Sequence, residues 1–353
     1  MKIIHIITAF GIGGAEKLLL EVANIQVKEH DVHLIYLKPI DDLVSFLDKD
    51  VKIKRIGLSI TTIKELKNYY RKVKPDIIHT HLSHADILGL WSAKKIPTKL
   101  FCTMHNIHFK KNYIDLFLFR IYRFLFTSRK IKPNVISISK AVEEHVISTL
   151  KVAQNNSFLL YNAIPVKREQ IERENLTIDR VKLLFIGRLE KQKSLDTLLD
   201  AIAYLNNDKI LLTIVGDGAL RCFLEKKVDD LKLTDNVTFE GKQKNTSKFY
   251  ENADIFILPS IWEGFGIVIL EAFRAKVPVI ASNIEGPSEL IKNNVNGVLF
   301  EPKNHIQLAE KIKHLIDNKS LRQKIAENGY KSFSDEFEIS NYVKKLNELY
   351  VKA

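Results

Sequence analysis

Short apolar runs alternate along the chain with longer stretches in which apolar residues recur every three or four positions. Residues 2–8 form the first run and residues 14–28 the first periodic stretch, which predicts a buried strand followed by an amphipathic helix. Ser139 is a candidate N-cap for a later helix over residues 140–150. The other strands predicted in the first half are residues 31–37, 51–56, 76–80, 98–104 and 134–139.

A second series of alternating strands and helices begins near Val181. Strands that alternate with helices predict parallel sheets with right-handed crossovers, so the fold class is α/β. Two such series predict two doubly wound, Rossmann-like domains. The strands predicted in the second series are residues 181–186, 210–215, 237–239, 254–258, 278–281 and 297–300.

The boundary between the two series is polar and charged, without an apolar period. We therefore predict a linker over residues 166–180, between an N-terminal domain of residues 1–165 and a C-terminal domain of residues 181–335. Residues 336–353 contain a last helix, over 336–351, which we expect to pack back on the N-terminal domain.

Composition places the chain among ordinary globular proteins. Of its 353 residues, 46% are hydrophobic and 27% are charged. The two cysteines, Cys102 and Cys222, have no metal-ligand spacing and favour a reducing compartment. No apolar run approaches the roughly 20 residues that span a bilayer. We expect a cytoplasmic protein, either soluble or peripheral on the inner face of the cell membrane.

The formal charge of +12 is concentrated in the first half. Residues 1–165 contain 25 Lys and Arg against 14 Asp and Glu, which suggests that this half meets an anionic partner. A lysine-rich surface that serves solubility alone is the alternative. No nucleic-acid-binding motif occurs, so nucleic acid is not an expected partner.

A glycine-rich turn follows the first strand and contains Gly13 and Gly14. Such a turn at a helix start lets backbone amides approach a phosphate, although a tight strand–helix connection is the plain alternative. A dinucleotide site is disfavoured, because Glu16 replaces the third glycine of that fingerprint and the second strand ends at Leu37-Lys38 without an acidic residue.

Two further segments follow predicted strands of the second series. Residues 187–193 contain Arg188 and Lys193, cations suited to phosphate, although charged loops are usually only solvated. Residues 258–272 lead from a strand through a glycine turn into an apolar helix that carries Glu271. A carboxylate in an apolar helix needs a partner, either a ligand hydroxyl or an internal cation, and spacing alone leaves both open.

These segments together resemble the retaining glycosyltransferases of family 4, which have the GT-B fold. Glu263 and Glu271, separated by seven residues, match the characteristic glutamate pair of that family. Blocks in the expected order also match, and the resemblance covers nearly the whole chain. They are Gly-Gly-Ala-Glu at 13–16, Gly-Arg-Leu at 187–189, Gly-Asp-Gly at 216–218, Pro-Ser at 259–260 and Val-Pro-Val-Ile-Ala-Ser at 277–282.

The resemblance implies a donor site at a cleft between the two domains. Glu271 is implied to bind the donor ribose, and Glu263 the donor sugar. Arg188 and Lys193 are implied to neutralise the diphosphate, and His105 to lie near the sugar. The other implied donor-binding positions are Gly13, Gly14, Gly187, Gly216, Gly264, Phe265, Gly266 and Ile267.

The implied reaction moves a hexose or N-acetylhexosamine from a nucleoside-diphosphate sugar, with UDP favoured, to a glycan or polyisoprenyl-linked acceptor. It retains the anomeric configuration and serves the synthesis of capsule, lipopolysaccharide or another surface polysaccharide. A nucleotide-sugar epimerase of the same fold is the alternative. We expect no cofactor and no metal, because the Asp48–Asp50 pair precedes a predicted strand instead of ending one.

Residues 110–132 combine seven basic residues with many aromatic ones and a single acid, Asp115. A helix of this composition suits an anionic membrane surface. Its apolar residues are too numerous for one narrow stripe, so we expect part of the helix to belong to the domain core.

Overall fold

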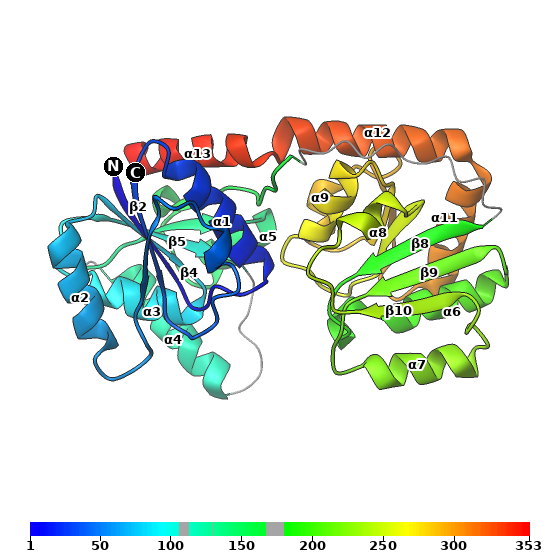
Figure 1. The fold of residues 1–353 in the computed structure, drawn as a ribbon, viewed down its shortest axis with the longest axis horizontal. Coiled ribbons are helices and arrows are strands. Elements are labelled where there is room, and N and C mark those ends of the chain that lie inside the picture. The colour runs from blue at the N-terminus through cyan, green and yellow to red at the C-terminus, as the bar shows by residue number, and fades with distance from the viewer. Residues whose placement is uncertain (106–112, 129, 167–179) are drawn as a thin grey trace. The chain divides into compact units, whose positions relative to one another are not determined.

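The computed structural model describes residues 1–105, 113–128, 130–166 and 180–353, and only the backbone of residues 113–115. The chain divides into two compact units (Figure 1). The first comprises Met1–Pro165 and Ile339–Ala353, and the second comprises Val166–Glu338. The predicted linker lies almost entirely outside the described residues.

The described part of the first unit forms a seven-stranded sheet in the order β3-β2-β1-β4-β5-β6-β7, with every neighbouring pair parallel. Its strands are β1 (Lys2–Ile7), β2 (Asp31–Tyr36), β3 (Lys52–Arg55), β4 (Ile77–His81), β5 (Lys99–Met104), β6 (Asn134–Ser137) and β7 (Ser157–Leu159). Its helices are α1 (Gly14–Gln26), α2 (Thr62–Val73), α3 (Ser83–Ser92), α4 (Tyr113–Thr127), α5 (Lys140–Ser148) and α13 (Ile339–Lys352), with short 3-10 turns η1 (Val44–Phe46) and η2 (Gln154–Asn156).

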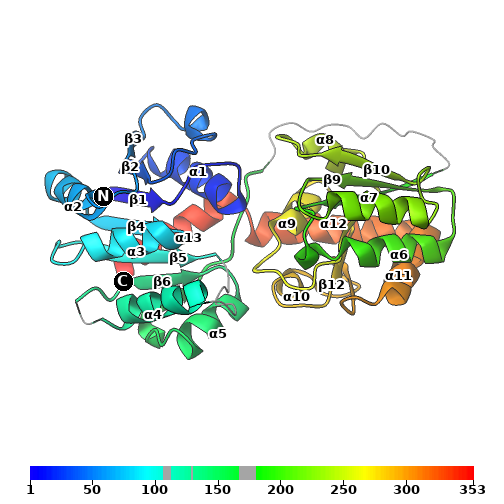
Figure 2. The ribbon, with the colours of Figure 1, turned by 90° about the horizontal axis from the view of Figure 1, so that it is seen from below.

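The second unit forms a parallel six-stranded sheet over its described residues, in the order β10-β9-β8-β11-β12-β13, with helices on both faces (Figure 2). Its strands are β8 (Val181–Ile186), β9 (Ile210–Val215), β10 (Val237–Gly241), β11 (Ile255–Leu258), β12 (Val279–Ser282) and β13 (Val298–Phe300). Its helices are α6 (Leu195–Leu205), α7 (Arg221–Asp230), α8 (Ser247–Glu251), α9 (Ile267–Arg274), α10 (Pro287–Leu290), α11 (His305–Asp317) and α12 (Lys319–Glu336), with the 3-10 turn η3 (Lys191–Lys193).

The predicted fold class is confirmed, since both sheets have the doubly wound order in which the first strand lies beside the fourth. The Ser139 cap is also confirmed, because its hydroxyl accepts a bond of 3.2 Å from the Val142 amide. The predicted start of the last helix is wrong: Glu336 still belongs to α12, and α13 begins at Ile339. β7 was not predicted, because it is short and only half-buried.

The C-terminal helix α13 is part of the core of the first unit. Tyr342, Leu346 and Tyr350 on its inner side are buried in one apolar cluster with Ile3 of β1 and Phe101 of β5. α13 also packs against α1. One face of the first sheet is therefore closed by helices from opposite ends of the chain.

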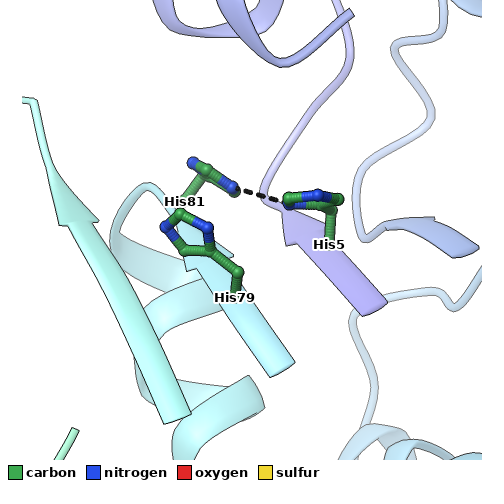
Figure 3. Close-up of side chains that lie close together, drawn as sticks. All are labelled: His5, His79 and His81. Carbon is green, nitrogen blue, oxygen red and sulfur yellow. Dashed lines mark hydrogen bonds between the residues drawn. The ribbon is translucent and has the colours of Figure 1, made fainter. Parts of the chain in front are cut away.

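His5, His79 and His81 form a row of buried histidines on two strands of this sheet (Figure 3). His5 of β1 stands opposite His79 of β4, and His81 follows two residues later on the same face. His5 Nε2 lies 2.7 Å from Gln26 Oε1 of α1, and His79 Nδ1 lies 2.6 Å from the Tyr350 hydroxyl of α13. These bonds tie both helices to the sheet.

Burial keeps the histidine row uncharged. Desolvation lowers the pKa of His5 to about 4 and the pKa values of His79 and His81 well below their ordinary range. The native state therefore binds fewer protons than the unfolded chain between about pH 4 and the ordinary histidine pKa near 6.5.

We expect the free energy of unfolding to fall as the pH is lowered from 7 towards 4, because the unfolded state takes up protons that the native row excludes. His5→Gln keeps a hydrogen-bonding group but removes one such proton. It should make the loss smaller by up to roughly 3 kcal/mol, as measured by urea unfolding at each pH. His305→Gln in the second unit is the control, and equal pH dependence in both variants would contradict the assignment.

Candidate functional site

The strand order of the second sheet reverses between β8 and β11. The chain winds outward in one direction from β8 and in the other from β11, so the loops after these two strands diverge to opposite sides. Ligands of doubly wound folds bind in the crevice that such a reversal leaves at the carboxyl ends of the strands. The two loops here are residues 187–193, after β8, and residues 259–266, after β11.

The two loops are joined by backbone and side-chain contacts. The Ile261 amide donates to the Gln192 carbonyl at 2.8 Å, and Gln192 Nε2 donates to the Trp262 carbonyl at 2.9 Å. Beside these bonds, Lys193 Nζ forms an ion pair with Glu263 Oε1. The structure thus brings together two of the residues that the sequence singled out on separate loops.

The Lys193–Glu263 pair is largely removed from water, with side chains 13% and 9% exposed. The Ser260 hydroxyl donates a further bond of 2.7 Å to the same Glu263 oxygen. A charge at such burial is tolerated only when it is paired and hydrogen-bonded. Lys193, Glu263 and Ser260 therefore form one hydrogen-bonded cluster, in which the ammonium and the hydroxyl both donate to the carboxylate.

Glycines let the backbones of the loops around this cluster come into direct contact with one another. Gly216 has φ 139°, and a Cβ there would lie 1.9 Å from the Gly187 carbonyl oxygen, so only glycine fits between the loops after β8 and β9. Gly266 has φ 95° and precedes the first residue of α9, Ile267. Gly286 has φ 87°, and a Cβ there would lie 3.0 Å from the Glu263 carbonyl oxygen. We did not predict this supporting role of Gly286.

Glu271 lies in the second turn of α9 and is half-buried. Among the described residues its hydrogen-bond partner is the hydroxyl of Tyr250 on α8, which donates to Oε2 at 2.8 Å. The sequence indicates that Glu271 needs a partner, but it does not identify Tyr250, because no motif joins residues 21 positions apart on different helices.

The remaining predicted residues of the second unit surround the ion pair without joining it. Arg188 is exposed, and its guanidinium pairs with Glu190 Oε1 on its own loop at 2.8 Å. Phe265 is buried, and Gly264 is half-buried in the loop before α9. The Ile269 amide in the first turn of α9 donates to the Gly266 carbonyl at 2.8 Å, whereas the amides of Ile267 and Val268 precede any helical carbonyl that could accept from them and are suited to an anion.

The other predicted residues, Gly13, Gly14 and His105, belong to the first unit. Gly13 precedes α1, and a Cβ there would lie 2.2 Å from Glu16 Oε2, so the Glu16 carboxylate folds over this turn. Burial raises the pKa of Glu16. His105 follows β5, and burial lowers its pKa to about 4. Its Nε2 is buried without a hydrogen-bond partner among the described residues. The cleft predicted between the domains stays a prediction.

The histidine row has ligand nitrogens within 4.8 Å of one another, close enough for a metal ion to be considered. Both ring nitrogens of His79 are engaged, however, with the Tyr350 hydroxyl at 2.6 Å and the Thr103 hydroxyl at 2.7 Å. His5 Nδ1 and His81 Nε2 lie 3.3 Å apart and share a hydrogen bond. A metal ion would have to displace these bonds, so we assign the row to the hydrogen-bonded core.

Comparison with known proteins decides the family. Residues 12–168 match the family described as Glycosyltransferase Family 4, and residues 166–332 match Glycosyl transferases group 1. The chain belongs to these glycosyltransferases. The matches give no support to the alternative of an epimerase.

This glycosyltransferase has relatives along its whole length. It is 26% identical to the UDP-Gal:alpha-D-GlcNAc-diphosphoundecaprenol alpha-1,3-galactosyltransferase of Escherichia coli, over 99% of this chain and 97% of the relative. It is 29% identical to the GalNAc-alpha-(1->4)-GalNAc-alpha-(1->3)-diNAcBac-PP-undecaprenol alpha-1,4-N-acetyl-D-galactosaminyltransferase of Campylobacter jejuni, over 97% and 96%.

Solved structures support the fold of the glycosyltransferase. Alr3699/HepE of Anabaena, solved in complex with UDP, aligns with a TM-score of 0.89 and 19% identity, covering 100% of both chains. At this identity the likeness shows the GT-B fold and nothing finer. No helix within the described residues has both the length and the apolar character needed to cross a bilayer.

We expect Lys193→Met to lower the free energy of unfolding by about 3 kcal/mol, because it leaves the Glu263 carboxylate desolvated without a counter-charge. Adding Glu263→Gln to Lys193→Met should recover part of that loss. Urea unfolding of both single variants and the double variant measures the coupling. If the losses of unfolding free energy in the two single variants simply add in the double variant, Lys193 and Glu263 do not interact as a pair.

Proposed function

We propose that this glycosyltransferase moves a hexose or N-acetylhexosamine from a nucleoside-diphosphate sugar to a glycan or polyisoprenyl-linked acceptor, with retention of configuration. The observation that supports it is the nearly buried Lys193–Glu263 pair at the strand reversal, with Glu271 on the helix that follows. The names of both relatives include an undecaprenol-linked sugar, and one includes UDP-Gal. These names favour UDP and a lipid-linked acceptor.

The proposed chemistry is the departure of a nucleoside diphosphate, which gathers negative charge as the bond to the sugar breaks. Preorganised cations and amides at that charge lower the barrier most. Lys193 has three ammonium protons, so it can keep its bond to Glu263 and still donate to a phosphate oxygen. Arg188, whose exposed guanidinium pairs with Glu190, would turn to the same diphosphate.

The carboxylates would recognise the neutral parts of the donor. Glu263 would accept from sugar hydroxyls and Glu271 from ribose hydroxyls, while the amides of residues 264–267 meet the phosphates. Gly13, Gly14 and His105 of the first unit keep their implied roles beside phosphate and sugar as part of this proposal. No cofactor or metal is included, since Arg188 and Lys193 supply the positive charge.

The transfer is tested by incubating the protein with UDP- and GDP-sugars and a membrane lipid extract, and by following sugar in the lipid fraction. Glu271→Ala should raise the Kd for the active donor about 10- to 100-fold, because a hydrogen bond to a charged acceptor is lost. Glu310→Ala, an exposed glutamate on α11, is the control. A donor that is isomerised while no sugar reaches any acceptor would sink the transferase proposal.

We further propose that α4 rests on an anionic membrane surface that carries the acceptor. Tyr122, Leu125 and Phe126 face the core, as expected for part of this segment, whereas Phe117 and Phe124 are 64% and 55% exposed. Arg120 and Arg123 are exposed on the same side of the helix. Basic and aromatic side chains on one helical face suit the boundary between lipid headgroups and acyl chains.

The α4 surface is held firmly from beneath. The Tyr122 hydroxyl donates to Asp86 Oδ2 of α3 at 2.7 Å, and burial raises the pKa of Asp86 to about 7. On the outer side, the ring centroids of Phe124 and Trp91 lie 5.9 Å apart, and Lys94 Nζ lies 5.7 Å from the centroid of the Trp91 ring. Trp91 is itself 40% exposed, so the apolar surface continues onto α3.

Binding to vesicles that contain anionic lipid should weaken at least tenfold in Phe117→Ser/Phe124→Ser, because two apolar side chains no longer enter the lipid. Phe223→Ser removes an equally exposed phenylalanine from α7, 56% exposed, and should leave binding unchanged. Co-sedimentation at two salt concentrations measures both. Equal binding by the two variants would remove α4 from the proposal.

A further inference from the structure

The hydroxyl of Tyr250 is placed to control the second glutamate of the site. Tyr250 lies on α8, is 1% exposed and donates to Glu271 Oε2 at 2.8 Å. The same hydroxyl lies 3.2 Å from the Val268 carbonyl oxygen, one turn earlier on α9. It therefore contacts both the side chain of Glu271 and the helix that carries it.

Tyr250 is itself held in place. Its ring packs on Phe256 of β11 with centroids 5.5 Å apart, and its amide lies 3.5 Å from the Thr246 carbonyl at the start of α8. A buried tyrosine in such packing has little rotamer freedom. A glutamate at the surface of a helix has three rotatable bonds and no preferred carboxylate direction of its own.

The hydroxyl is a permanent donor. Burial, and next the adjacent Glu271, raise the pKa of Tyr250 well above its ordinary value, so the phenol keeps its proton. The bond occupies one lone pair of Oε2. The other carboxylate oxygen, Oε1, has no partner within the part of the chain that the structure describes, and Glu271 is only half-buried.

We propose that Tyr250 is a positioning residue that sets the direction in which Glu271 accepts hydrogen bonds, and hence the selectivity of the site for a ribonucleotide over its deoxy forms. This inference rests on the proposed function, in which Glu271 meets the ribose. With Oε2 fixed by the phenol, Oε1 presents both of its lone pairs to neighbouring donors. The 2′- and 3′-hydroxyls of a ribose are two adjacent donors of the required kind.

A freely rotating carboxylate would meet the same hydroxyls only part of the time. Loss of the Tyr250 hydroxyl should therefore weaken recognition of the ribose while leaving the phosphate and sugar contacts, which do not involve α8, in place. The transfer step should change less than binding. This separation of KM from kcat distinguishes a positioning residue from a merely structural one.

The experiment compares UDP, or GDP if it binds more tightly, with its 2′,3′-dideoxy form by titration calorimetry. The wild type should prefer the ribonucleotide at least tenfold, in keeping with hydrogen bonds to a charged acceptor. Tyr250→Phe, which keeps the ring, should lose most of that preference. It should also raise the donor KM about five- to tenfold with kcat within about twofold. Tyr70→Phe removes another buried hydroxyl, bonded to the Gly89 carbonyl in the first unit, and should change neither value.

The outcomes separate this inference from the function on which it rests. If the wild type does not distinguish the two nucleotides, Glu271 does not meet the ribose and the proposed site fails. If Glu271→Gln abolishes the preference but Tyr250→Phe retains it in full, the site stands and the positioning role is wrong. In the Glu271→Gln background, Tyr250→Phe should cause no further loss, and an independent further loss would also overturn it.

Discussion

The reversal of strand order in each sheet is the constraint on which the molecule depends. Between β8 and β11 the chain changes its direction of winding, and the two loops at their carboxyl ends are left beside each other without a helix between them. The charged residues of the candidate site in the second unit all lie on these two loops or on α9, the helix that follows the second loop. The same reversal between β1 and β4 places the Gly13 turn and His81 at the corresponding edge of the first sheet.

Hydrogen bonds between polar side chains link several elements that are distant in sequence. His5, His79 and Glu271 each take their partner from an element distant in sequence, respectively Gln26, Tyr350 and Tyr250. Such bonds add little net stability, but a buried polar group without its partner costs more than a bond contributes. They therefore act mainly against alternative packings: α13 seated one turn away would leave His79 without the Tyr350 hydroxyl.

Much of the fold could be read from the sequence, because parallel strands buried on both faces appear as continuous apolar runs. β7 was not predicted because it has only three residues and they are only half-buried. The start of the last helix was misplaced because α12 and α13 are separated by only two residues, Phe337 and Glu338, and no glycine or proline marks the break.

The candidate site was predictable where residue type and position on a loop suffice, as for Lys193 and Glu263. It was not predictable where a contact joins separate elements. Nothing local to Tyr250 distinguishes it from any buried tyrosine. Gly286 precedes α10, and its role depends on a backbone oxygen of a loop more than twenty residues earlier. Arg188 shows the opposite case, since a cation expected at the centre is paired with its neighbour Glu190.

The first unit is discontinuous, and this affects how the protein is made. After Pro165 the ribosome adds the whole second unit before Ile339 begins the helix that completes the first. At about 5–20 residues per second, this interval is on the order of ten to thirty seconds. Throughout it, α1 already packs on this face of the sheet, but Phe101 and His79 lack the contacts that Tyr350 of α13 supplies. The first unit is therefore begun before the second unit and completed only after it, and the nascent chain must keep the site of α13 free of other contacts during that interval.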